Sequence, residues 1–141
     1  MSVRHCSAPQ WPVHNVQMTG LIQVLGAVFG VLLISVGIVE TLFLRDQRLQ
    51  RLSVADPDNT ETVRLGTLNQ GFYNVIWGVG AIVGALMLGG ANASAGEAVL
   101  LFVCIGHMVL GLAMFLTERR LWGLAIAEAV LPLIITILLL V

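Results

Sequence analysis

The chain has 141 residues, of which 57% are hydrophobic and 11% are charged, and its formal net charge is −1. Its mean hydropathy of +0.93 lies well above the usual range of soluble domains. These values exclude an ordinary soluble globular domain and indicate a membrane protein, for which we expect membrane lipids and no nucleic acid as partners.

Each spanning helix needs about 20 mostly apolar residues, since the hydrocarbon core is about 30 Å thick and a helix rises about 1.5 Å per residue. Four stretches of the sequence meet this requirement. We therefore predict an all-α fold, an integral membrane antiparallel four-helix bundle. The predicted parts are a polar outer N-terminal tail at 1–19 and a transmembrane domain at 20–141, with spans at about 20–44, 71–90, 98–117 and 121–141 and a cytoplasmic loop at 45–70.

The placement of the arginines predicts the orientation of the chain. There are seven arginines and no lysine, and all the arginines except Arg4 fall on one side of the predicted bundle. Because cytoplasmic loops carry an excess of positive charge, we expect a multi-pass protein of a bacterial inner (plasma) membrane with both termini outside the cytoplasm. The cytoplasmic arginines are Arg45, Arg48, Arg51, Arg64, Arg119 and Arg120.

The first predicted span carries a glutamate, Glu40, near its cytoplasmic end, about 7 Å below Arg45 by helical rise. An ionisable group inside a span is costly and is a functional candidate. A glutamate this shallow could also extend to Arg45 or to lipid headgroups.

The second predicted span begins with a group of hydrogen-bonding side chains. Gln70, Tyr73, Asn74 and Trp77 follow the spacing i, i+3, i+4, i+7 and so share one helix face. We interpret them, together with Asn69, as candidate ligand-binding residues. In a simpler interpretation Asn69 and Gln70 are helix caps and Trp77 is an interfacial anchor.

The third and fourth predicted spans carry His107 and Glu128. His107 lies near the middle of its span, on one stripe with Cys104 and Gly111, and either takes part in proton transfer or bridges two helices as a neutral imidazole. Glu128 is deeper than Glu40, and Pro132 deprives the Glu128 carbonyl of its helical hydrogen-bond donor. We predict that Glu128, Glu40 and His107 are the catalytic candidates for acid–base chemistry.

Glycine pairs and scattered metal-ligating residues give weaker signals. Gly26 with Gly30, and Gly80 with Gly84, permit close helix packing or self-association. A metal at the outer face could use His5, Cys6 and His14, but their spacing is unspecific. No phosphate-binding loop, nucleophile elbow or dinucleotide fingerprint is present, so we expect neither a metal site nor a cofactor.

The hexapeptide "NQGFYN", from Asn69 to Asn74, resembles the "NQGxYN" element of the Domain of Unknown Function 1304 family, small bacterial proteins with four predicted spans. Glu40, the basic link "TERRLWG" and the polar residue ahead of Pro132 also fit this family. Its fourth-span polar residue is expected to be a glutamine closer to the proline, so Glu128 departs from the pattern. The resemblance covers about 20–141 and implies the four-span fold but no activity.

Three functions are compatible with this sequence. The first is a polar intramembrane pocket near the cytoplasmic leaflet that binds a lipophilic or amphiphilic small molecule, with or without acid–base catalysis on it. The second is a proton-coupled small-molecule exporter, which at this size would need to form a homodimer. The third is an accessory structural subunit of a larger membrane complex, in which the polar residues hold the helices together.

Overall fold

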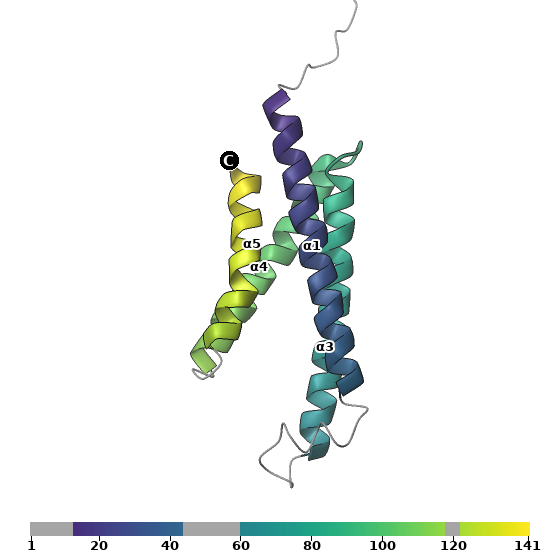
Figure 1. The fold of residues 1–141 in the computed structure, drawn as a ribbon, viewed down its shortest axis with the longest axis vertical. Coiled ribbons are helices and arrows are strands. Elements are labelled where there is room, and N and C mark those ends of the chain that lie inside the picture. Colours follow the sequence, from purple (N-terminus) through teal and green to yellow (C-terminus); the bar gives the residue numbers. More distant parts are fainter. Residues whose placement is uncertain (1–12, 44–59, 118–121) are drawn as a thin grey trace, which may run out of the picture.

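The computed structural model describes residues 13–43, 60–117 and 122–141, and within these ranges the chain is almost entirely helical and contains no strand. Successive helices run in opposite directions, so that they form an antiparallel bundle (Figure 1). The prediction of an all-α four-helix bundle is confirmed. The helices are α1 (Val13–Phe43), α3 (Thr60–Met87), α4 (Ala93–Thr117) and α5 (Trp122–Leu140).

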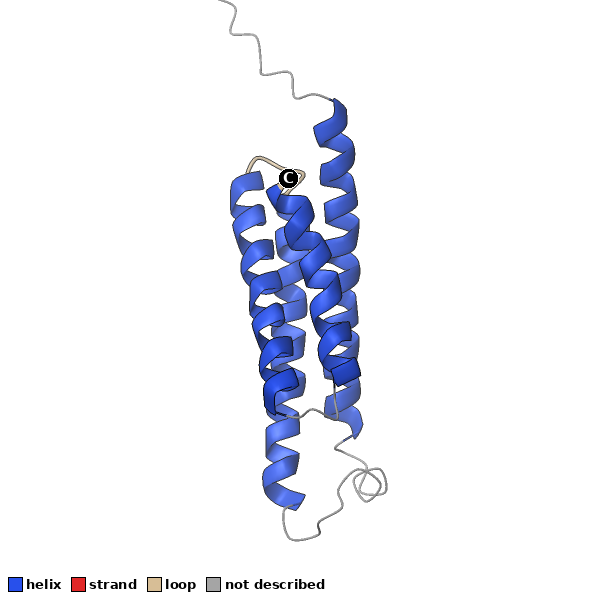
Figure 2. Cartoon of the chain, turned by 90° about the vertical axis from the view of Figure 1, so that its left-hand side faces the viewer, coloured by secondary structure: helices blue, strands red, loops and turns tan. Residues whose placement is uncertain are grey.

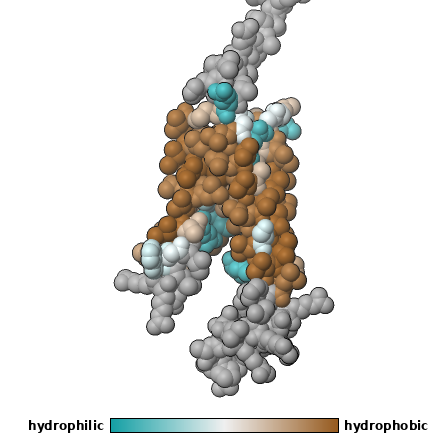
Figure 3. All heavy atoms as spheres, in the orientation of Figure 1, coloured by the Kyte–Doolittle hydropathy of each residue, from teal (hydrophilic) through white to brown (hydrophobic). Residues whose placement is uncertain are grey.

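Three of these helices are long and apolar enough to cross a membrane. The qualifying segments are Gln17–Leu42, Leu68–Met87 and Ala93–Thr117, while α5 contributes a shorter apolar segment, Ala125–Leu140. Large apolar side chains cover most of the outer surface of the bundle (Figure 3). A soluble protein would bury many of them, whereas a lipid environment accepts them where they are.

The helix that carries the polar hexapeptide is longer than its predicted span. The sequence predicts a second span at about 71–90, and α3 begins earlier, since it runs without interruption from Thr60 to Met87. Of the arginines that predict the orientation, only Arg64 falls in a described helix, and the others lie outside the described residues.

Glycines bring α1 and α3 into backbone contact. A Cβ atom on Gly78 would lie 2.5 Å from the carbonyl oxygen of Gly30, and a Cβ atom on Gly71 would lie 2.8 Å from that of Gly37. Only glycine permits such close approach, because any side chain would force the helices apart. The two helices are therefore held side by side at two levels, one Gly30–Gly78 and the other Gly37–Gly71.

The contacts of α3 with α4 and of α4 with α5 also depend on small residues. A Cβ atom on Gly84 would lie 3.1 Å from the Gly96 carbonyl oxygen of α4, and one on Gly111 would lie 3.0 Å from the Ala125 carbonyl oxygen of α5. Gly26 and Gly84, which belong to the glycine pairs noted in the sequence, thus contribute to packing inside the bundle, since a Cβ atom on Gly26 would lie 3.0 Å from that of Ala85.

The bundle consists of two helix pairs, α1 with α3 and α4 with α5. At one end α4 lies against α3, and towards the other end it diverges to accompany α5 (Figures 1 and 2). The divergence leaves a notch between the two pairs, with hydrophilic side chains at its closed end (Figure 3). The start of α1 and the end of α5 lie at the opposite end of the bundle from this notch (Figure 1).

Candidate functional site

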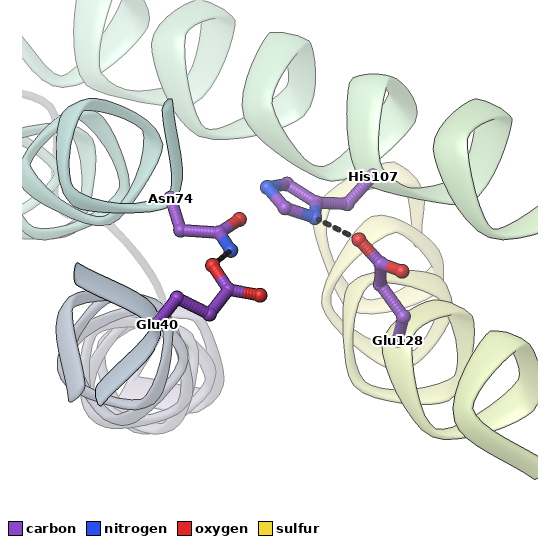
Figure 4. Close-up of polar contacts among 4 residues, drawn as sticks. All are labelled: Glu40, Asn74, His107 and Glu128. Atoms are coloured by element: carbon purple, nitrogen blue, oxygen red, sulfur yellow. Dashed lines mark hydrogen bonds and ion pairs between the residues drawn. The ribbon is translucent and has the colours of Figure 1, made fainter. Parts of the chain in front are cut away.

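Each of the four helices places one polar side chain at the same interior point. Glu40 comes from α1, Asn74 from α3, His107 from α4 and Glu128 from α5 (Figure 4). They form two hydrogen-bonded pairs, one from each helix pair of the bundle.

The first pair joins α1 to α3. The Asn74 side-chain amide donates a hydrogen bond of 2.8 Å to Oε2 of Glu40, and Asn74 is only 6% exposed. Both residues lie three positions after a glycine of the close helix contact, Glu40 after Gly37 and Asn74 after Gly71. The close approach of the two backbones therefore sets the distance at which these two side chains meet.

The second pair joins α4 to α5 in the same manner. Nδ1 of His107 lies 3.2 Å from Oε1 of Glu128, and the side chains are 0% and 19% exposed, respectively. Gly111, one turn after His107, is in backbone contact with Ala125, which lies three positions before Glu128. Here too a small residue in the helix contact positions the polar pair.

Aromatic rings enclose the imidazole of His107. The ring of Phe29 meets it edge-on with centroids 5.3 Å apart, and the ring of Trp77 does so at 5.8 Å. Trp77 in turn packs against Phe102 and covers the backbone at Gly106. His107 thus lies between aromatic rings from α1 and α3.

One nitrogen of this ring has no partner. Nε2 of His107 is fully buried and makes no hydrogen bond within the part of the chain that the structure describes. In Figure 4 this nitrogen points towards Asn74, on the far side of the ring from Glu128. The imidazole therefore lies between the two pairs, bonded to one and directed at the other.

The two carboxyl groups face the same space. In Figure 4 both point into the gap between the α1–α3 pair and the α4–α5 pair, and both side chains are partly exposed, whereas Asn74 and His107 are buried behind them. The carboxyl groups thus form the accessible part of the site.

The predicted site residues divide into two groups. The structure brings together Glu40, Asn74, His107 and Glu128, with Trp77 as an apolar wall. By contrast, the exposed residues of α3 include Asn69, Gln70 and Tyr73, the last at 54% exposure. Since neighbouring helix positions differ by about 100° in direction, Tyr73 cannot share the inward direction of Asn74. A ligand-binding role for these three residues stays a prediction.

Two features of the site were missing from the prediction. Phe29 gives no signal in the sequence, because a phenylalanine in an apolar span is ordinary. The glycines of the α1–α3 contact do give one, since Gly30 and Gly37 are seven residues apart and so are Gly71 and Gly78. Equal seven-residue spacing in two helices predicts that they pack through these positions.

The described residues contain no group of three or more histidine, cysteine or acidic side chains that could hold a metal ion. His5 and Cys6, which were considered as ligands at the outer face, lie outside these residues.

Comparison with known proteins gives one match. A family model described as "Protein of unknown function (DUF1304)" matches residues 24–141. No curated protein and no solved structure matches the chain.

Proposed function

This chain belongs to the DUF1304 family of proteins of unknown function, and we propose that it is an integral membrane protein that binds a small amphiphilic molecule at the polar site inside its bundle. The observation that carries the proposal is the meeting of four polar side chains, one from each helix, at the closed end of a notch. Polar groups inside a membrane protein are costly and mark substrate sites or proton pathways.

The incomplete hydrogen bonding of the site favours ligand binding over a purely structural role. A polar lock between helices is most stable when every buried donor and acceptor is paired, because an unpaired one costs about 1–3 kcal/mol. Here Nε2 of His107 is unpaired, and both carboxyl groups keep an oxygen free of the two hydrogen bonds of the site. A bound molecule would supply the missing partners.

Proton transfer is the chemistry that these residues could perform on the bound molecule. A carboxylate that accepts a hydrogen bond from one imidazole nitrogen fixes the tautomer and leaves the other nitrogen as a base. Glu128 holds Nδ1 of His107 in this manner, while Nε2 points into the site. Isomerisation, cyclisation or epoxide opening would use these groups, with Asn74 orienting the molecule.

We place the notch at the cytoplasmic leaflet of a bacterial inner membrane, with α5 as the fourth span. Arginine placement supports this orientation, in which the start of α1 and the end of α5 lie on the outer side, at the other end of the bundle from the notch. An amphiphile would then enter from the inner leaflet, with its polar head first.

Copurification tests the binding proposal. The wild-type protein, purified in detergent, should carry an amphiphilic molecule that mass spectrometry of a solvent extract detects at a fixed ratio to protein. Glu128→Gln and Asn74→Ala should remove most of it while yield and folding stay normal. The matched control is Glu97→Gln, which removes a carboxylate from an exposed position of α4 outside the site. The proposal fails if the extracts of all four proteins are alike.

The same experiment separates binding from a subunit role. If the polar pairs only hold the helices together within a larger complex, a partner protein should copurify and both site substitutions should lower the amount of protein in the membrane. A loss of abundance without a loss of bound molecule per protein would overturn the binding proposal.

A second candidate, proton-coupled export, is favoured by the two carboxyl groups that face the same gap, which could take up either protons or a cationic molecule. Export predicts that a deletion strain becomes sensitive to cationic amphiphiles, and that wild-type resistance disappears when the proton gradient is collapsed. Unchanged sensitivity of the deletion strain would exclude this candidate.

A further inference from the structure

We propose that the head group bound at this site is an ammonium that carries N–H groups, held between the carboxylates of Glu40 and Glu128. This inference rests on the proposed function and names the chemical class of its ligand. It follows from the balance of hydrogen-bond donors and acceptors, from the charge of the site and from the buried Nε2 of His107.

The site has far more acceptors than donors. When Glu128 is ionised, Nδ1 of His107 donates to it, so that Nε2 is an acceptor. The Asn74 amide donates one of its two N–H groups to Glu40, and the Asn74 carbonyl oxygen is a further acceptor. Each carboxylate also keeps one oxygen that these hydrogen bonds do not use. A ligand that completes the hydrogen bonding must therefore donate.

The charge of the site points in the same direction. With both carboxyl groups ionised and the His107 ring uncharged, the site carries two negative charges and no positive one, because the Asn74 amide is uncharged. In a medium of low dielectric constant two uncompensated carboxylates are very unfavourable. Either protons or a bound cation must compensate them, and an ammonium does so while it donates hydrogen bonds.

The buried nitrogen provides an observation independent of the carboxyl groups. Nε2 of His107 is fully buried, without a partner among the described residues, and directed into the space between the two pairs. An ammonium held between the carboxyl groups of Glu40 and Glu128 would also donate to this nitrogen, which gives Nε2 the partner that it lacks among the described residues.

The surroundings fit an apolar tail on this head group. Above the notch, the helix faces seen in Figure 3 carry large apolar side chains that are exposed. An alkyl chain attached to the ammonium would lie against these faces and in the surrounding lipid, as membrane amphiphiles do.

The test compares probes that share a tail and differ in the head. Dodecylamine, dodecyltrimethylammonium, dodecanol and dodecanoate are titrated into the full-length protein in nanodiscs of zwitterionic lipid, with empty nanodiscs as the blank for partitioning. The reporter is Trp77, whose ring contacts His107. Its emission is isolated by Trp11→Phe and Trp122→Phe in every protein used.

We expect saturable binding of dodecylamine in its ammonium form, and binding at least about tenfold weaker for the trimethylammonium, which has the charge but no N–H group. The alcohol and the carboxylate should bind more weakly still. Glu40→Gln and Glu128→Gln should each weaken dodecylamine binding by about tenfold or more, since each removes a charge-assisted hydrogen bond.

The control variant is again Glu97→Gln, which removes the same charge from an exposed position and should change the affinity by less than about twofold. Equal effects of Glu97→Gln and Glu40→Gln would overturn the inference, because partitioning into the membrane would then explain the signal. Equal binding of the amine and the alcohol would overturn it as well.

Failure of this inference is distinguishable from failure of the proposed function. If dodecanol or dodecanoate binds more tightly than dodecylamine, and this binding is lost in Glu40→Gln, the ammonium proposal is refuted. The site would still be a ligand-binding site. If no probe binds above the blank, the ammonium is refuted, and the copurified molecule still decides the proposed function.

Discussion

At the scale of single residues, the Glu40 carboxyl group illustrates how this protein holds a charge inside a bundle. Its partner in the site is the neutral amide of Asn74, which donates a hydrogen bond of 2.8 Å but brings no positive charge. Such a bond orients the carboxyl group without neutralising it. The group thus stays available to a proton or to a cation from outside the chain.

The Glu40–Asn74 hydrogen bond should be measurable as a coupling free energy. In a double-mutant cycle of Glu40→Ala and Asn74→Ala, followed by unfolding in mixed micelles, we expect a coupling of about 1.5–3 kcal/mol, the range for a hydrogen bond to a charged group. The control cycle combines Asn74→Ala with Glu97→Ala and should give a coupling near zero. A Glu40–Asn74 coupling below about 0.5 kcal/mol would show that the bond contributes little.

The residues of this site could be predicted from the sequence in part. An ionisable group in an apolar span has few favourable positions besides the bundle interior, and for this reason Glu40, His107 and Glu128 were found. Helical spacing could not separate Asn74 from Tyr73, because a face defined by i, i+3 and i+4 is wider than the strip of α3 that meets α1 and α4. The pairing itself also depends on helix separation, which no single helix specifies.

At the scale of helices, glycine controls that separation. The Gly37–Gly71 contact lies one turn from the Glu40–Asn74 pair, and the Gly111–Ala125 contact lies one turn from the His107–Glu128 pair. Each hydrogen bond of the site thus depends on a nearby backbone contact between two helices.

Substitution of a contact glycine should therefore destabilise the α1–α3 pair. Gly78→Ala places a Cβ atom 2.5 Å from the Gly30 carbonyl oxygen, and we expect a loss of about 1–3 kcal/mol in the free energy of unfolding. The control is Gly20→Ala on α1, whose Cβ atom meets nothing within 4 Å and whose helix propensity improves by up to about 1 kcal/mol. Thermal unfolding in detergent measures the stability of both variants. Similar stabilities of Gly78→Ala and Gly20→Ala would refute the close Gly30–Gly78 contact.

Helix existence was predictable because long apolar stretches can only be helical in a membrane protein. Helix length was less predictable for α3, since the residues from Thr60 to Gln70 are polar enough to suggest a loop although they continue the helix. The hydropathy of the sequence predicts where a helix leaves an apolar environment. The backbone hydrogen bonds of the helix can continue beyond that point.

At the scale of the whole molecule, the orientation in the membrane is open to a direct test. Alkaline phosphatase fused after Val141 should be active and green fluorescent protein at the same position should be dark, because we place the C-terminus outside the cytoplasm. The control is a pair of fusions within the 45–70 segment, which should give the reverse result. A fluorescent C-terminal fusion would place the notch at the outer leaflet.

The backbone contact between Gly84 and Gly96 can serve as a pivot about which the α1–α3 pair rotates relative to the α4–α5 pair. Ten residues of α3, about 15 Å of helix, separate Gly84 from Asn74, so each degree of rotation about this contact displaces Asn74 relative to the α4–α5 pair by about 0.3 Å. A tilt of about ten degrees therefore changes the gap between the two helix pairs at this level by about 3 Å, close to the width of one water molecule. Small motions at the crowded end of the bundle are thereby amplified at its open end.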